Sequence, residues 1–457
     1  MKVTFIGGGS LRLIPILRGV MAECPQVFED AELRFFDLHQ DRAQAVMTLL
    51  QHSPEFRNAG KCHFVCPETL DDALKNIDIC YLTMGIRREP QTVQAAHLCN
   101  EVGLISTDQL SLTGAFWGVQ LGKIVCGIAE KLAKLSPDAL MLIFANPVAV
   151  YSCMIERFLG VNALGICGGF NNHRYDLSRL FGKDEYTKEC DVVAAGVNHL
   201  SFILRGTFKG EDIYQSAAPR LLHDSWKNIF DNNFILHETM DLMRQIYCKH
   251  KYLVFSTEID GIYYLAPEKI SNLQKKLLPP SASYNPVESG KAAAEKVENN
   301  FRILLESAKG PLTDEIYSEK NPLFTANTRD ISVPIFKACA NIEKMRIVAS
   351  GMNNGVIAGM PAEAAVEYTI DIEGKKITPV ENQFIPAPFV NIVSSLSEFQ
   401  TLLGEAIVKH DHRIFASALE AYPFCKKDVV GKLFGLFKDI IDSEMQKASK
   451  LFTERRV

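Results

Sequence analysis

The sequence lacks several features that would assign the protein to other classes. Its formal net charge is only -5, and it contains no block of basic residues, which argues against nucleic-acid binding. No apolar run reaches the length of a membrane span, and Lys2 leads directly into an apolar strand rather than a signal peptide. The twelve cysteines include no C-x-x-C pair. We therefore expect reduced thiols, a cytoplasmic location, and no nucleic-acid or membrane partner.

What the sequence does contain is a glycine turn directly after its first apolar run. Lys2–Ile6 predicts a strand, Gly7-Gly8-Gly9-Ser10 predicts a tight turn, and Leu11–Met21 predicts a helix. This order opens a βαβ unit that binds a dinucleotide, because glycine lets a pyrophosphate come close to the backbone and to a helix N-terminus. Arg12 stands in the place of the third fingerprint glycine, so a purely structural glycine turn remains an alternative.

An acidic residue follows the second predicted strand. The segment Ala31–Phe36 ends at Asp37, in the place where dinucleotide-binding domains hold the ribose hydroxyls. A carboxylate there repels a 2′-phosphate, so Asp37 favours NAD over NADP. An exposed turn acid is the simpler alternative.

The alternation of strands and helices predicts the fold class. Two domains are expected at this length: an NAD-binding domain over residues 1–165 and an α+β domain over 166–457. Apolar strands that alternate with amphipathic helices indicate an α/β fold with a doubly wound parallel sheet. In the first domain we predict strands at Lys2–Ile6, Glu32–Phe36, His63–Cys66, Ile79–Leu82 and Leu140–Phe144, and helices at Asp41–Leu50 and Gly118–Leu135.

The second domain mixes strands and long helices. We predict a mobile loop at Leu273–Glu288, which is rich in Lys, Pro and Ser. The predicted strands are Val192–Gly196, Phe202–Phe208 and a β-rich stretch over Ile347–Ile377, and the predicted helices are Pro219–Ile246, Glu288–Ser307, Leu396–Val408, Ile414–Ala421 and Lys427–Leu451.

Two sets of residues could carry chemistry in the second domain. Cys167 and His199 offer a thiolate and an imidazole, which can share a divalent metal, although a buried cysteine and a structural histidine are the default interpretation. Asp260, Tyr263 and Tyr264 form the densest group of proton-transfer candidates, and solvated or packed side chains are the alternative.

Three further motifs have simpler interpretations. Arg87 follows the end of a predicted strand and could bind an anionic group of a substrate, or be merely exposed. Asn353-Asn354-Gly355 predicts a turn, and His410-Asp411-His412-Arg413 predicts a polar connection between two helices rather than a metal cluster.

The order of these motifs resembles glycoside hydrolase family 4, the NAD-dependent glycosidases. The resemblance covers nearly the whole chain and rests on motifs in the right order: Ile6-Gly7-Gly8-Gly9-Ser10, Phe144-Ala145-Asn146-Pro147, Gly165-Ile166-Cys167, Gly196-Val197-Asn198-His199 and Asn354-Gly355-Val356-Ile357. It implies a Rossmann-like first domain and a second domain similar to the C-terminal domain of lactate and malate dehydrogenases.

The resemblance also implies cofactors and a mechanism. NAD would lie on Gly7, Gly8, Gly9, Ser10 and Asp37, and a divalent metal, usually manganese, would be held by Cys167 and His199. Hydride would pass from sugar C3 to NAD+, the C2 proton would be removed, the aglycone would leave by elimination, and water addition and hydride return would complete hydrolysis without net redox change.

The resemblance assigns the remaining roles residue by residue. Asn146 would contact the sugar, and we add Asn198 and Arg87 as substrate-binding candidates. Asp260 is the first choice for the C2 base or leaving-group acid, with Tyr263 and Tyr264 as alternatives.

One departure concerns the substrate. The family has His, Asn or Asp after the cysteine, whereas here Gly168 follows Cys167. We expect an unphosphorylated α-hexoside or hexuronide; the alternatives are a 6-phospho-glycosidase, an NAD-dependent dehydrogenase of a hydroxy acid or sugar, and a catalytically silent NAD-binding protein. We also expect a homo-oligomer, a dimer or tetramer.

Overall fold

Residues 2–165, called the first half of the chain below, fold into a parallel sheet in the Rossmann order β3-β2-β1-β4-β5-β6. The computed structural model describes residues 1–58, 61–84, 96, 99, 104, 106–107, 109–181, 190–223, 227–230, 234–255, 261–269, 286–425, 430–435 and 438. The parallel strands are β1 (Lys2–Ile6), β2 (Glu32–Phe36), β3 (His63–Val65), β4 (Ile79–Leu82), β5 (Leu140–Ile143) and β6 (Ala163–Gly165). The predicted strands of this half are confirmed, and β6, which is only three residues long, is the one that the sequence analysis did not predict.

The central strands are buried on both faces, as parallel strands must be when helices cover the sheet. The helices of this half are α1 (Leu13–Glu23), α2 (Gln40–Gln51), α3 (Pro54–Arg57), α4 (Leu70–Leu74), α6 (Leu112–Leu135) and α7 (Val148–Leu159). Helix α6 begins six residues earlier than predicted, because the Ser111 hydroxyl caps it by accepting the Gly114 N–H at 3.3 Å.

Helix α6 corrects one expectation about membranes. By length and composition it could cross a bilayer, with a mean hydropathy of 1.3, so the statement that no apolar run reaches this length is wrong. In the fold, 72% of this apolar window is buried inside the protein, where the helix packs against α7. Its apolar character is that of a core helix.

The sheet does not end with the parallel strands but continues as an antiparallel one, β6-β11-β13-β7-β8-β10. Strand β6 meets β11 at a single register pair, Gly165 opposite Ser350. The added strands are β7 (Cys190–Val197), β8 (Leu200–Phe208), β9 (Glu211–Asp212), β10 (Leu253–Val254), β11 (Met345–Met352), β13 (Ala365–Glu373) and β14 (Lys376–Pro379), while β12 (Ile357–Ala358) and β15 (Gln383–Phe384) form a separate pair.

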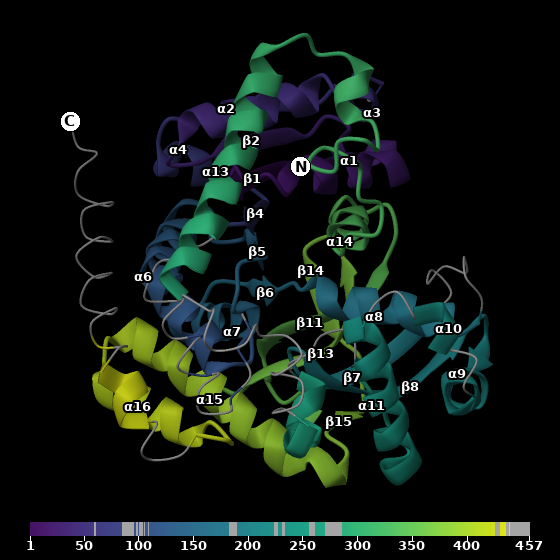
Figure 1. The fold of residues 1–457 in the computed structure, drawn as a ribbon. Helices are drawn as coiled ribbons and strands as arrows, with labels where there is room; N and C mark the ends of the chain where they lie inside the picture. Colours follow the sequence, from purple (N-terminus) through teal and green to yellow (C-terminus); the bar gives the residue numbers. More distant parts are fainter. Residues whose placement is uncertain are drawn as a thin grey trace.

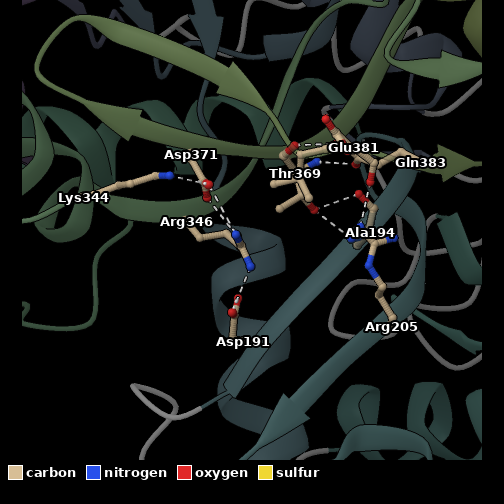
Figure 2. A network of polar contacts seen from close by, with 10 residues as sticks. Asp191, Ala194, Arg205, Lys344, Arg346, Thr369, Asp371, Glu381 and Gln383 are labelled. Carbon is tan, nitrogen blue, oxygen red and sulfur yellow. Dashed lines mark hydrogen bonds and ion pairs between the residues drawn. The ribbon is translucent and has the colours of Figure 1, made fainter.

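A polar network ties β7, β11 and β13 together (Figure 2). Arg346 of β11 pairs with Asp371 of β13 at 2.8 Å and with Asp191 of β7 at 2.9 Å. Thr369 of β13 uses its hydroxyl to accept the Ala194 N–H at 2.7 Å and to donate to the Ala194 carbonyl at 3.0 Å. Side chains thus supplement a short backbone ladder between β13 and β7.

The predicted helices over 288–307, 396–408 and 414–421 are confirmed, whereas the helices over 168–179 and 332–339 were not predicted. The predicted helix over 219–246 is wrong as a single element, because α9 ends at Leu222 and α11 begins at Phe234. The Lys427–Leu451 helix and the Leu273–Glu288 loop lie largely outside the described residues. The described helices are α8 (Gly168–Arg179), α9 (Ile213–Leu222), α10 (Lys227–Phe230), α11 (Phe234–His250), α13 (Pro286–Lys309), α14 (Ser332–Cys339), α15 (Val390–Lys409) and α16 (His412–Ala421).

Two of these helices return to the first half of the chain. Helix α13 lies beside α2, and α14 packs on α1 (Figure 1). At Gly19 of α1 there is no room for a side chain, because an added Cβ would overlap the Asn327 carbonyl. The division at residue 165 stays a prediction.

Arg18 of α1 binds the segment between α13 and α14. Its guanidinium is buried, pairs with Glu55 at 2.7 Å, and donates to the carbonyls of Tyr317 and Phe324. Charges buried in this way depend on their partners, because removing one leaves the other desolvated and unpaired.

We expect Arg18→Met to lower the free energy of unfolding by about 3 kcal/mol, because half-buried Glu55 would lose its cation and the carbonyls of Tyr317 and Phe324 would lose their donor. The measurement is urea denaturation followed by circular dichroism. Arg302→Met is the control: Arg302 pairs with Glu306 on the exposed face of α13, and its loss costs about 0.5 kcal/mol or less. Equal losses in the two variants would contradict the role given to Arg18.

Candidate functional site

The glycine turn lies at the carboxyl edge of the parallel sheet and is packed too closely for side chains. Gly7 has a φ of +83° and a Cβ there would lie 3.0 Å from the backbone of Thr83, just beyond β4. A Cβ on Gly8 would lie 2.7 Å from the Phe36 nitrogen, and one on Gly9 would lie 2.7 Å from Arg42 Cβ. The turn therefore requires glycine for its own packing as well as for an approaching ligand.

The turn's N–H groups are mostly used within the protein. Those of Gly7 and Gly8 donate to the Phe36 carbonyl at 3.0 and 2.8 Å, and that of Gly9 donates to Asp37 Oδ2 at 3.0 Å.

In the first turn of α1, where Arg12 provides no side-chain cap, the Leu13 N–H also donates within the protein, to the Ser10 carbonyl at 3.1 Å, and Pro15 has no N–H. The Ile14 N–H is the donor of this turn that could face a pyrophosphate. Arg12 itself lies over the Phe144 ring, 4.2 Å from its centroid.

Asp37 lies where a ribose would be held. Its carboxylate is half-buried and is fixed by the N–H groups of Gly9 and, at 2.9 Å, of His39. It therefore sits directly beside the glycine turn, as the sequence analysis expected of a ribose-binding acid.

Asn146 stands at the same edge, after β5. The Asn146–Pro147 peptide is cis, and Asn146 Oδ1 accepts a hydrogen bond from Gln109 Nε2 at 2.6 Å. Gln109 Oε1 in turn accepts the Val148 N–H at 3.1 Å. Gln109 positions the Asn146 side chain, and no sequence pattern pointed to this residue.

Cys167 and His199 are brought together by the fold although 32 residues separate them. Cys167 Sγ lies 3.3 Å from His199 Nε2. Two atoms that each bind the same ion at roughly 2.0–2.3 Å have a separation of this size. A thiolate and an imidazole are also suitable donors for a borderline divalent metal, so the residues present fit a shared ion.

Cys167 is presented by the short strand β6 and by α8. It follows β6 and caps α8, where its sulfur accepts the Gly169 N–H at 3.4 Å. At Gly168, an added Cβ would meet only Asn172 Nδ2 at 4.0 Å, so the position departing from the family pattern leaves open space.

His199 is presented by the two-residue turn between β7 and β8, which the register pair Val197 and Leu200 closes. Its φ of +69° is left-handed, and two neighbours confine it. Its imidazole stacks on the Phe255 ring at 5.5 Å between centroids, and Gly261 lies so close that a Cβ would overlap the His199 carbonyl. Neither Phe255 nor Gly261 carries a pattern that sequence reasoning could have connected with His199.

Asn198, the other residue of this turn, is buried rather than open to solvent. Its side chain is 1% exposed, and Nδ2 donates to Glu367 Oε1 of β13 at 2.8 Å. Its described contact is therefore with the protein, and the substrate-binding role expected of it stays a prediction.

The structure separates the proton-transfer candidates. Tyr264 is buried and shares a 2.6 Å hydroxyl contact with Tyr422, which occupies its hydroxyl in the packing of the C-terminal helices. Burial, with a smaller effect from Glu238, raises the pKa of Tyr263 to about 12, so the phenol is a poor base near neutral pH. Asp260 and Arg87 lie outside the described residues.

Two polar motifs serve the fold. Asn353 is fully buried and its side chain bonds Ile357, Met360 and Pro361, which shapes the turn where Asn354 and Gly355 take positive φ. His410 ends α15 in the left-handed conformation and Asp411 caps α16. Across the described part of the chain, no group of three or more His, Cys, Asp or Glu side chains is gathered as a metal cluster.

With this fold and site in view, comparisons with known proteins define the class. The model of family 4 glycosyl hydrolases matches residues 2–181, and the model of the family's C-terminal domain matches residues 194–424. The chain belongs to family 4 of the glycosyl hydrolases, as the motifs predicted.

The relatives in sequence are distant but extend over most of the chain. The α-galactosidase of Bacillus subtilis (strain 168) is 24% identical over 394 residues, which cover 83% of this chain and 82% of that protein. The 6-phospho-β-glucosidase of Escherichia coli (strain K12) is 23% identical over 444 residues, which cover 94% and 92%.

Solved structures share the fold. The 6-phospho-β-glucosidase of Thermotoga maritima, solved with manganese, NAD+ and glucose-6-phosphate, has a TM-score of 0.73 at 16% identity, covering 97% of this chain and 99% of its own. A 6-phospho-α-glucosidase from gut microorganisms, solved with NAD and Mn2+, has a TM-score of 0.71 at 18% identity, with 98% of each chain covered. The predicted fold class, a Rossmann-like α/β sheet followed by an α+β domain, is confirmed.

We expect Gly261→Ala to displace His199, because the added methyl group would overlap the His199 carbonyl. The dissociation constant for Mn2+ should rise at least about tenfold, as measured by electron paramagnetic resonance of the free ion. Gly168→Ala is the matched control, since its methyl group meets open space, and it should stay within about twofold of the unaltered protein. The reverse order of the two variants would refute this description of the site.

Proposed function

We propose that this family 4 glycosidase hydrolyses O-glycosides by transient NAD-dependent oxidation at sugar C3, deprotonation at C2, elimination and water addition, with manganese as the metal. The observation that carries the proposal is the 3.3 Å approach of Cys167 Sγ and His199 Nε2 at the edge of a dinucleotide-binding sheet. NAD and manganese in the solved structures of similar glucosidases support it.

Different residues would bind NAD, the sugar and the metal. The glycine turn and the first turn of α1 would receive the pyrophosphate, and Asp37 would hold the ribose hydroxyls. Asn146, oriented by Gln109, would bind the sugar beside them. Cys167 and His199 would hold the metal and leave its other positions open to sugar oxygens.

When bound, NAD would accept and return a hydride and the metal would polarise the sugar oxygens, so that cleavage needs no external oxidant. The chain must also supply a base for the C2 proton. Asp260 remains our first choice for this base or for the leaving-group acid. The packing of Tyr264 against Tyr422 and the raised pKa of Tyr263 make both tyrosines weaker candidates for the base.

The proposed substrate is an unphosphorylated α-hexoside or hexuronide. Two of the described side chains beside the metal pair and Gly168, Phe255 and Asn172, are uncharged. A sugar phosphate is normally bound by cationic side chains. The similarity to an α-galactosidase also favours this substrate class.

Of the two alternative functions, one has specific support and the other is disfavoured. Several relatives are 6-phospho-glucosidases, so a 6-phospho-glycoside is the second candidate. A plain dehydrogenase would accumulate NADH, and the Cys167–His199 pair argues against it because hydroxy-acid dehydrogenases of this fold use histidine without a metal. We propose a homo-oligomer in the cytoplasm.

The decisive experiment is glycoside cleavage with NAD+ and Mn2+ supplied or withheld. We expect activity only when both are present, and products formed in D2O should carry deuterium at C2, because the C2 proton is exchanged during elimination. Product analysis by NMR measures both quantities. Cleavage that persists after complete removal of the nucleotide would overturn the proposed function.

Cys167→Ser tests the metal assignment within the same assay. It should abolish cleavage while leaving NAD+ binding intact, since a hydroxyl is a much weaker ligand than a thiolate. Cys248→Ser is the control, because Cys248 is an exposed thiol of α11. Full activity of Cys167→Ser would remove Cys167 from the metal site.

A panel of nitrophenyl α- and β-hexosides, hexuronides and 6-phosphoglycosides tests the substrate class. We expect kcat/KM for an unphosphorylated α-hexoside or hexuronide to exceed that for its 6-phospho counterpart by at least about tenfold, because Phe255 and Asn172, the uncharged side chains described beside the metal pair and Gly168, offer a phosphate no ionic partner. A preference for the phosphorylated sugar would establish the second candidate.

A further inference from the structure

A buried carboxylate of β13 contacts the turn that carries His199. Glu367 is 2% exposed, and its Oε1 accepts the hydrogen bond from Asn198 Nδ2 at 2.8 Å. The register of the sheet places Glu367 opposite Gly196, at the end of β7. Glu367 therefore bonds to the two-residue turn that joins β7 to β8.

The turn depends on such a contact. His199 holds a left-handed φ of +69°, a conformation that is unfavourable for a residue with a side chain and persists only where the surroundings impose it. The backbone ladder between β13 and β7 contributes two register pairs, at Gly196 and Ala195. The β7–β8 ladder, Phe255 and Gly261 also restrain the turn, and the side-chain bond from Glu367 adds a restraint from β13.

A carboxylate at the buried position 367 has a high desolvation cost. Burial raises its pKa, and the hydrogen bond from Asn198 opposes that rise. A buried carboxylate is costly unless it is hydrogen-bonded, and an apolar side chain would pack here at lower cost. The carboxylate accepts its hydrogen bond from Asn198 in the turn beside His199, and the Ser201 hydroxyl of β8 also interacts with it.

We propose that Glu367 is a positioning residue, which holds Asn198 and thereby directs the His199 imidazole toward the Cys167 sulfur. The inference rests on the proposed function, in which Cys167 and His199 hold the metal. Residues that orient a metal ligand without touching the metal change metal affinity by about 10–100-fold when they are replaced.

Two substitutions of Glu367 in the full-length chain separate the hydrogen bond from the rest of the side chain. Glu367→Met removes the acceptor at similar volume, whereas Glu367→Gln keeps an acceptor oxygen at the same reach. We expect the Mn2+ dissociation constant to rise at least about tenfold in Glu367→Met and to stay within about threefold in Glu367→Gln. The thiolate-to-cobalt absorption band of the Co2+-loaded protein should shift in the first variant only.

Thr369→Val is the matched control, because it removes the neighbouring bridge from β13 to Ala194 of β7 (Figure 2). It should lower the melting temperature without changing Mn2+ affinity or the cobalt band. If Glu367→Met behaves as Thr369→Val does, Glu367 only stabilises the sheet and the proposal is wrong. If Glu367→Met does not fold, Asn198→Ala provides the same test, since it removes the other half of the hydrogen bond.

Cys167→Ser distinguishes failure of this inference from failure of the proposed function. If this variant binds Mn2+ as tightly as the unaltered protein, the metal assignment itself is wrong. If it loses Mn2+ while Glu367→Met and Asn198→Ala both retain it, the metal assignment stands and only the positioning role of Glu367 is overturned.

Discussion

The pairing of β6 with β11 is the constraint on which the site depends. It joins the last parallel strand to the first antiparallel one through a single register pair, Gly165 opposite Ser350. Gly165 has no room for a side chain, because a Cβ would lie 2.8 Å from the Val148 carbonyl and 3.1 Å from Ser350 Cβ. Since Cys167 follows two residues later, this close junction places its sulfur between the two halves of one continuous sheet.

The parallel and the antiparallel parts of the sheet contribute different residues to the site. The parallel half ends in a glycine turn, a carboxylate and an amide at one edge, which suit a dinucleotide and a sugar. The antiparallel half contributes a hairpin that can hold a histidine at a fixed angle, because strands pack on both its sides. The proposed function, in which a hydride is taken and returned, would use both halves of the sheet.

Much of the fold was predictable because its strands are apolar runs bounded by polar residues. β1, β2 and β4 have the predicted limits, and the glycine turn, Asp37 and Asn146 lie at the expected edge. The errors have local causes. β6 is too short to show a period. The helix predicted to begin at Pro219 begins instead at Ile213, because Asp212 caps it, and it ends at Leu222. The Cys167–His199 pair was expected from family resemblance, since no local spacing connects two residues 32 positions apart.

The sequence by itself indicated the doubly wound parallel sheet and the glycine turn, because these depend on short-range pattern and residue chemistry, and the resemblance to the family added the pair of potential ligands. Only the tertiary structure decided that Gln109 orients Asn146, that Gly261 and Phe255 confine His199, and that Glu367 holds Asn198. These contacts join residues far apart in the chain. Such partners are chosen by how strands and helices pack, and a linear pattern carries no record of that packing.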